Sequence, residues 1–174
     1  AELQKSGILP TIDHVNLFLT WGEVEGIVCS GIDKGKKTTY ALLDERVPPT
    51  RELCREEALA RLASRYFQSH SPAQLQDFVW WSGLTATECR FAINLIKAEL
   101  MTETFDSRDY FIHQSWKGKN ESEPVLRLLP AFDEYLISYK NRTDVLPLEH
   151  HPKAFNRFGT FYPVILYNGK IIGN

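Results

Sequence analysis

Residues 71–88 read SPAQLQDFVWWSGLTATE, and this stretch decides the fold of the middle of the chain. Its first four residues are typical of a helix start. Ser71 can cap free backbone N–H groups, Pro72 suits the first helical position, and Gln74 can reach back as in a capping box. The stretch therefore predicts a short helix from about residue 73 to residue 81.

The second half of the stretch ends one helix and begins another. Gly83 supplies the left-handed residue on which helices commonly end. Thr85 and Glu88 have the spacing of a second capping box, so we expect a further helix from there to about Leu100. Two helices joined by a short turn that contains glycine are typical of a helix-turn-helix.

The flanking residues extend this pattern to a winged helix. Upstream, apolar residues recur at helical spacing over residues 56–67 and predict a first helix. Downstream, residues 101–105 and 110–114 read as strands joined by a polar turn over residues 106–109. Three helices followed by a hairpin are the order of elements in a winged helix. We expect one complete unit over residues 50–114.

A shortened form of the same order occurs near the N-terminus. Thr11 precedes a helix expected over residues 12–25, and strands expected over residues 27–30 and 38–43 follow it. Too few residues precede this helix to supply the two earlier helices of a winged helix. We therefore expect residues 1–49 to form a partial winged helix, in a chain that begins inside its first unit.

Residues 115–174 are expected to form a linker and a small β-rich segment. A polar linker over residues 115–123 precedes a strand at 125–130 and a short helix or turn at 133–139. Asn168-Gly169, placed between two apolar runs, is a strong hairpin signal, and we expect the second strand to continue beyond the last residue. The expected fold class is α+β, with tandem winged helix-turn-helix units, the first incomplete, followed by this segment.

Composition limits the classes of function. The chain has 174 residues, 43% of them hydrophobic and 24% charged, which is ordinary for a globular protein. No apolar run approaches the roughly 20 residues that span a bilayer, and the N-terminus lacks a signal-peptide core. Three distant cysteines without a C-x-x-C pair favour reduced thiols in the cytoplasm. The net charge of -2 means that any DNA-binding surface must concentrate basic residues locally.

Four stretches resemble one family. They are GIVCSG (26–31), TYALLDERVP (39–48), DFVWWSGL (77–84), and LLPAFDEYL (128–136) with YKNR (139–142). The chain resembles winged-helix DNA-binding proteins that include the bacterial interstrand-crosslink-repair DNA glycosylases, the AlkZ-like proteins.

The resemblance implies a longer protein that stacks several winged helices on DNA. In the glycosylase branch it implies a catalytic Gln-x-Gln motif in the N-terminal part. Gln74-Leu75-Gln76 matches only in letters, because it falls at the start of a later helix. We therefore expect a C-terminal half without catalytic residues, whose partners are duplex DNA and the N-terminal half of the same protein.

The helix expected from Thr85 carries the first candidate DNA contacts. In a helix-turn-helix the second helix enters the major groove, and its outward side chains meet base edges. The outward residues here are Thr87, Arg90, Asn94 and Lys97. Arginine can pair with guanine, asparagine with adenine, and lysine with phosphate or guanine. The alternative is that these residues are only the solvated face of an amphipathic helix.

Other basic residues are weaker candidates for phosphate contacts. They are Lys34, Lys36 and Lys37 in the glycine-flanked upstream loop, and Lys140 and Arg142 near the C-terminal segment. The upstream loop could equally be a solubilising loop. Arg108 lies between two aspartates, which weakens it as a phosphate contact. Trp80 and Trp81 are expected to serve packing rather than base stacking.

No cofactor or metal site is expected. Adjacent His150 and His151 with Glu149 rarely converge on one ion, and no further ligand is suitably spaced. Three functions remain open. The leading one is a DNA-binding module linked to DNA repair. The second is part of a DNA glycosylase acting on alkylated or crosslinked bases. The third is a protein-interaction scaffold that binds no nucleic acid.

Overall fold

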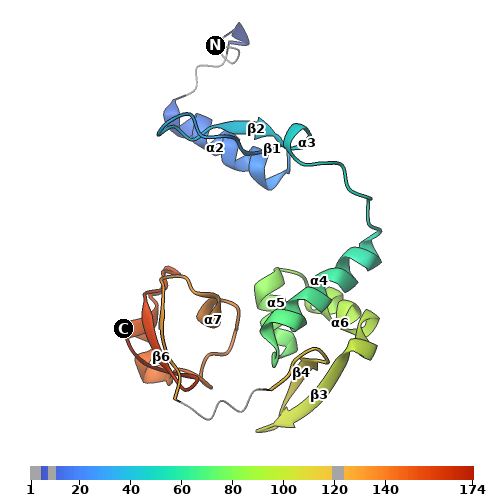
Figure 1. Ribbon diagram of the computed structural model, residues 1–174, viewed down its shortest axis with the longest axis vertical. Helices are drawn as coiled ribbons and strands as arrows, with labels where there is room; N and C mark the ends of the chain where they lie inside the picture. Colours follow the sequence, from blue (N-terminus) through green and yellow to red (C-terminus); the bar gives the residue numbers. More distant parts are fainter. Residues whose placement is uncertain (1–4, 8–10, 119–123) are drawn as a thin grey trace. The chain divides into compact units, whose positions relative to one another are not determined.

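A computed structural model describes residues 5–7, 11–118 and 124–174. The chain divides into two compact units, Ala1–Glu52 and Leu53–Asn174 (Figure 1). Helices and strands occur in both units, so the fold class is α+β as expected. Part of the expected linker, residues 119–123, lies outside the described residues.

The first unit contains one long helix and a two-stranded antiparallel sheet. Its elements are α2 (Ile12–Val24), β1 (Val28–Ser30), β2 (Tyr40–Leu42) and the short α3 (Leu43–Arg46). Thr11 is the N-cap of α2, and its hydroxyl accepts a hydrogen bond from the His14 backbone N–H at 3.3 Å. Gly26 turns the chain after the helix with a φ of 69°. The expected helix and strands are confirmed, whereas α3 was not expected.

The first unit has little core of its own. Leu17, Trp21 and Val24 on α2 are exposed, with between 62% and 79% of each residue accessible. None of the residues described up to Glu52 is buried. The second unit holds the buried cores of the described chain.

The second unit begins with three helices and a hairpin, which lie together in Figure 1. These elements are α4 (Arg55–His70), α5 (Leu75–Ser82), α6 (Ala86–Leu95), the 3-10 turn η1 (Lys97–Glu99), β3 (Leu100–Phe105) and β4 (Arg108–His113). Gly83 adopts a φ of 69° and ends α5, as expected. Asp106 and Ser107 both have positive φ, which suits the tight two-residue turn between β3 and β4.

The start of α5 differs from the expectation. Its N-cap is Gln74 rather than Ser71, and Asp77 completes the capping box. The reason is a long-range contact: Ala73 exchanges backbone hydrogen bonds with Phe111 of β4, which holds residue 73 in an extended conformation. The Ser71 hydroxyl instead donates to the Phe67 carbonyl at 2.5 Å.

The helix that follows is also shorter than expected. The Thr85–Glu88 capping box is present, but α6 ends at Leu95 and not near Leu100. The chain continues as η1 and then enters β3 at Leu100. Lys97 therefore lies in η1, two residues beyond the end of the helix on which it was expected.

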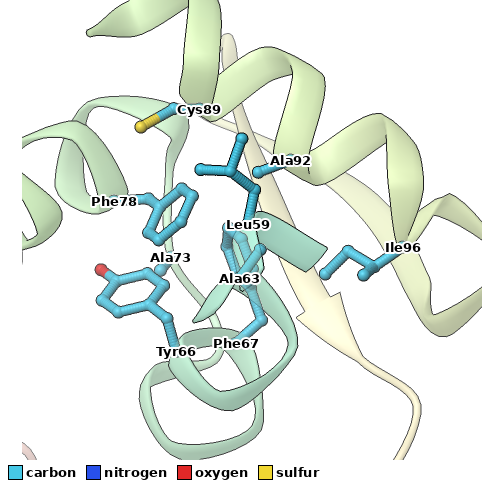
Figure 2. Packing of buried hydrophobic residues seen from close by; sticks show 9 residues of the cluster. All are labelled: Leu59, Ala63, Tyr66, Phe67, Ala73, Phe78, Cys89, Ala92 and Ile96. Carbon is cyan, nitrogen blue, oxygen red and sulfur yellow. The ribbon is translucent and has the colours of Figure 1, made fainter. Parts of the chain in front are cut away.

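The core between these helices comes mainly from the apolar face of α4. Figure 2 shows Tyr66 and Phe67 beside Phe78 of α5, with Cys89 and Ala92 of α6 closing the cluster. The ring centroids of Tyr66 and Phe78 lie 5.0 Å apart, and those of Phe67 and Phe78 lie 5.5 Å apart. The helical spacing of apolar residues in α4 correctly predicted this buried face.

The rest of the second unit is a three-stranded antiparallel sheet with short helices. Its elements are β5 (Leu126–Leu129), α7 (Glu134–Ile137), η2 (Leu148–His150), α8 (His151–Ala154), β6 (Val164–Tyr167) and β7 (Lys170–Gly173), and the strand order is β5-β6-β7. Asn168 and Gly169 have φ values of 44° and 77° and form the expected hairpin turn. A second core packs around Leu136, Leu146 and Val164.

Candidate nucleic-acid interface

Two capping contacts fix the orientation of α6. The Thr85 hydroxyl accepts a hydrogen bond from the Glu88 backbone N–H, and the Glu88 carboxylate accepts one from the Thr85 backbone N–H. Glu88 also pairs with Arg55 of α4. Hydrogen bonds from Thr85, followed by those from Arg55, lower the pKa of Glu88. Glu88, the one carboxylate on α6, is thus paired with Thr85 and Arg55 at the N-terminal end of the helix.

The sequence-derived candidates on and after α6 are all exposed: Thr87, Arg90, Asn94 and Lys97. Three of them line one shallow hollow of about 360 Å³. Its lining residues are Leu75, Arg90, Ile93, Asn94, Lys97, Leu100, Thr102 and Phe111. No carboxylate stands among these residues. The structure therefore brings two cations and an amide together in an acid-free hollow beside the hairpin.

The β3–β4 hairpin itself offers little free positive charge. Both terminal nitrogens of Arg108 donate hydrogen bonds to the Asp144 carboxylate, at 3.2 and 2.8 Å. These bonds raise the pKa of Arg108 above its ordinary value. In the sequence, the two aspartates that flank Arg108 indicated that Arg108 is a weak candidate for a phosphate contact. In the structure, Arg108 instead pairs with Asp144, 36 residues further along the chain.

The upstream lysines lie together on the loop between β1 and β2. Lys34 and Lys37 exchange backbone hydrogen bonds at 3.0 and 3.2 Å, and Gly35 between them has a φ of 66°. The side chains of Lys34, Lys36 and Lys37 are exposed. They form a separate basic loop in the first unit.

Lys140 and Arg142 both lie against Trp80 of α5. The Lys140 Nζ is 4.5 Å from the centre of the Trp80 ring, and the Arg142 Cζ is 5.6 Å from it. Trp80 Nε1 donates a hydrogen bond to the Ile137 carbonyl at 2.9 Å. Trp80 thus contacts the C-terminal segment but keeps 47% of its surface exposed, and Lys140 is exposed as well.

Arg142 is placed in the interior. Only 9% of the residue is accessible, and Nε donates to the Leu136 carbonyl at 2.5 Å. Its guanidinium lies 5.2 Å from the ring centres of both Phe155 and Phe161. Burial lowers the pKa of Arg142, because desolvation disfavours the charged form.

Sequence reasoning missed Asp77 as the residue that joins α5 to the C-terminal segment. Its Oδ1 accepts hydrogen bonds from the backbone N–H groups of Lys140 at 2.8 Å and Asn141 at 3.4 Å. Its Oδ2 accepts one from the Gln74 N–H at 2.9 Å. The spacing of Gln74 and Asp77 is itself that of a capping box, which is the signal that could have identified this residue.

A family model described as "DNA glycosylase AlkZ-like" matches residues 14–174. The chain belongs to this family. The AlkZ-like relatives include the interstrand DNA cross-link repair glycosylase of Streptomyces sahachiroi, which is 25% identical over 168 residues. That match covers 88% of this chain and 45% of the relative.

A solved structure supports the same family at the level of the fold. The Streptomyces sahachiroi DNA glycosylase AlkZ matches with a TM-score of 0.73 at 20% sequence identity. The match covers 98% of this chain and 56% of that protein. The chain thus spans about half the length of the relatives that it matches, and it corresponds to their C-terminal part.

The only Gln-x-Gln sequence of the chain, Gln74-Leu75-Gln76, lies at the start of α5. Gln74 is the N-cap of α5, and Gln76 lies on the first turn of that helix.

Among the described residues, no three His, Cys, Asp or Glu side chains gather where they could hold a metal ion. No helix in the described ranges is long and apolar enough to cross a membrane.

Proposed function

We propose that residues 53–114 form a winged helix that binds duplex DNA, as a module of a longer AlkZ-like protein of the cytoplasm. α4, α5 and α6 would be its three helices, and the β3–β4 hairpin its wing. α2 with β1 and β2 would be the last helix and the wing of a preceding unit. DNA repair is the process to which family membership links such a module.

The acid-free hollow beside α6 carries the proposal. The chain has 22 acidic and 20 basic residues, so its charge is nearly balanced overall. The lining of this hollow has two basic residues and no acidic one, and is therefore more positive than the chain as a whole. Phosphates of a DNA backbone are neutralised by lysine and arginine, and nearby carboxylates would repel them. Neither Arg90 nor Lys97 forms an ion pair within the described residues.

The residues of α6 would divide the work by chemistry. Arg90 and Asn94 lie one helical turn apart. Each side chain can make two hydrogen bonds to the edge of a base, arginine to guanine and asparagine to adenine. Lys97, beyond the end of α6, would reach a phosphate rather than a base. Thr87, near the N-terminus of the helix, would contribute a hydroxyl to either. Lys34, Lys36 and Lys37 in the first unit and Lys140 in the second would add phosphate contacts.

The test is charge reversal on α6 with a matched control on α4. Fluorescence anisotropy with a labelled duplex at low salt measures binding. The double variant Arg90→Glu, Lys97→Glu should weaken binding at least tenfold. The control, Arg61→Glu with Arg65→Glu, makes the same change of net charge at two exposed positions of α4. Equal weakening by both variants would show that net charge, and not α6, determines binding.

A second candidate function concerns the longer protein. The matched relative is described as an interstrand DNA cross-link repair glycosylase. We propose that the longer protein cleaves a base–sugar bond at a crosslinked or alkylated base, with catalytic residues outside this chain. Incubation of crosslinked DNA with this chain alone should then release no base, whereas release by this chain would contradict the assignment of chemistry to the remainder. Arg142 is buried, so it is not among the proposed phosphate contacts.

A further inference from the structure

The hollow beside α6 has an apolar floor that a phosphate group would leave unfilled. The floor is formed by Leu75, Ile93, Leu100 and Phe111, which are half-buried and pack against the helical core. They come from α5, α6, β3 and β4 respectively, so four elements meet beneath the hollow. Only apolar atoms gain free energy when they cover apolar surface and displace its water. The floor therefore suits a ligand that carries an apolar side chain.

The rim of the same hollow is polar and basic. Arg90, Asn94 and Lys97 line it and are exposed, whereas the floor residues are half-buried. Within the described part of the chain, neither cation of the rim forms an ion pair. Glu99, the carboxylate closest to Lys97 in the sequence, is already hydrogen-bonded to side chains of α4 and β4. A ligand with carboxylates beside its apolar group would therefore complement the rim and the floor together.

The shape of the hollow indicates one side chain of a larger partner rather than a small molecule. Small-molecule sites are deep enough to bury most of the surface of their ligand. This hollow, of about 360 Å³, is shallow and open to solvent. An apolar side chain that seats in a small depression, with polar and charged contacts around it, is the usual anchor of a protein–protein interface. The chemistry and the shape together favour a peptide segment.

The spacing of the rim cations sets the spacing of the acidic residues in such a segment. Arg90, Ile93 and Lys97 follow one another at intervals of three and four residues, so they share one face with the apolar residue between the cations. The two cations lie on the order of 10 Å apart along the helix axis. In an extended peptide, alternate side chains point the same way, and positions 1 and 5 lie about 13 Å apart. The long side chains of arginine and lysine can bridge this small difference.

We propose that this hollow docks an acidic, extended segment of a partner protein. An apolar side chain of the segment seats on the floor, and the acidic residues two positions before and after it pair with Arg90 and Lys97. The same two cations are the proposed DNA contacts, so the bound segment excludes duplex DNA from α6. This regulatory role rests on the proposed DNA-binding function, whereas the docking site itself does not.

The first arm of the test compares three end-capped peptides by NMR titration of the full chain at low salt. Asp-Ser-Leu-Ser-Asp should bind saturably and shift the amide signals of the residues that line the hollow. Ser-Asp-Leu-Asp-Ser has the same composition but turns its carboxylates away from the leucine, and Asp-Ser-Ser-Ser-Asp lacks the apolar anchor. Both controls should bind at least fivefold more weakly. Equal affinity of either control, or no saturable binding of the first peptide, would overturn the proposal.

Variants of the chain locate the peptide in the hollow. Thr102 of β3 is exposed and lines the hollow, so Thr102→Trp should fill it and abolish peptide binding. Met101 is also exposed but points to the opposite face of the hairpin, and Met101→Trp is the matched control that should bind as the unaltered chain does. Arg90→Gln with Lys97→Gln keeps the floor and should weaken binding at least tenfold. Loss of binding in both tryptophan variants, or in neither, would contradict the assignment.

The second arm tests the exclusion of DNA. Asp-Ser-Leu-Ser-Asp, added to the chain with a labelled duplex, should lower the anisotropy, whereas Ser-Asp-Leu-Asp-Ser at the same concentration should not. A duplex that stays bound when the first peptide saturates the hollow would overturn the regulatory role and leave the docking site in place. A duplex that does not bind at all would contradict the proposed function, and the peptide titrations would still decide whether the docking site exists.

Discussion

Arg108 and Asp144 form a two-pronged ion pair that joins the β3–β4 hairpin to the C-terminal segment. Arg108 Nη1 lies 3.2 Å from Asp144 Oδ2, and Nη2 lies 2.8 Å from Oδ1. The Tyr110 hydroxyl donates to the same carboxylate at 2.9 Å. The cation nearest the tip of the hairpin is therefore paired within the second unit.

This pair should make stability depend on pH. Hydrogen bonds from Arg108, then from Tyr110, hold the pKa of Asp144 below its ordinary value of 3.8. A lowered folded-state pKa stabilises the fold above pH 3.8, and this contribution is lost as the pH falls through the folded-state pKa. Asp144→Asn should lower the free energy of unfolding slightly at pH 7 and have little effect at the acid end.

Thermal unfolding of the Asp144→Asn variant and of the unaltered chain, measured at a series of pH values from 7 down to about 2.5, checks this prediction. Asp109→Asn is a suitable control, because Asp109 is an exposed hairpin aspartate whose only described partner is the nearby Thr104 hydroxyl. A difference between Asp144→Asn and the unaltered chain that stays constant across the pH range would show that the ion pair does not form.

Asp77 should contribute more to stability than a helix cap alone. The residue is only 3% accessible, and its carboxylate accepts from the N–H groups of Gln74, Lys140 and Asn141. Asp77→Ala would leave these donors without their partner, at about 1–3 kcal/mol for each buried group that stays unsatisfied. Urea unfolding should show a loss of at least about 2 kcal/mol. Glu149→Ala, at an exposed position, is the control. Equal losses in the two variants would contradict the role assigned to Asp77.

Phe78 should be the most costly side chain to shorten in the helical core. It is fully buried and packs against Tyr66 and Phe67. Phe78→Ala should lower the free energy of unfolding by roughly 3–5 kcal/mol, since the cavity left behind adds to the lost burial. Phe105, 67% accessible near the hairpin turn, serves as the control. Its replacement by alanine should change the unfolding free energy by no more than about 0.5 kcal/mol in urea titrations. Comparable effects would mean that Phe78 is not in the core.

Local chemistry explains which elements were predictable from the sequence. The capping pair Thr85 and Glu88, the left-handed Gly83 and the Asn168-Gly169 turn depend on neighbours within a few residues. Such signals act through the backbone of their own segment, so a single sequence contains them in full. The apolar face of α4 was predictable for the same reason.

Long-range contacts explain what the sequence did not reveal. Ala73 is extended because it pairs with Phe111, 38 positions away, which moves the start of α5 to Gln74 and Leu75. The burial of Arg142 depends on aromatic rings of Trp80, Phe155 and Phe161, which tertiary packing brings around it. The exposed positions Arg90 and Asn94 were predictable from helix periodicity, but their shared hollow with Thr102 was not.

The salt dependence of DNA binding tests the central claim most directly. Binding of a labelled duplex is measured by anisotropy over a series of salt concentrations, for the unaltered chain and for the Arg90→Gln, Lys97→Gln variant. Each phosphate contact contributes about 0.9 to the slope of log K against log salt. The account predicts measurable binding at low salt and a slope that is shallower in the variant by about one for each phosphate contact removed. Identical slopes, or no binding of the unaltered chain at low salt, would contradict it.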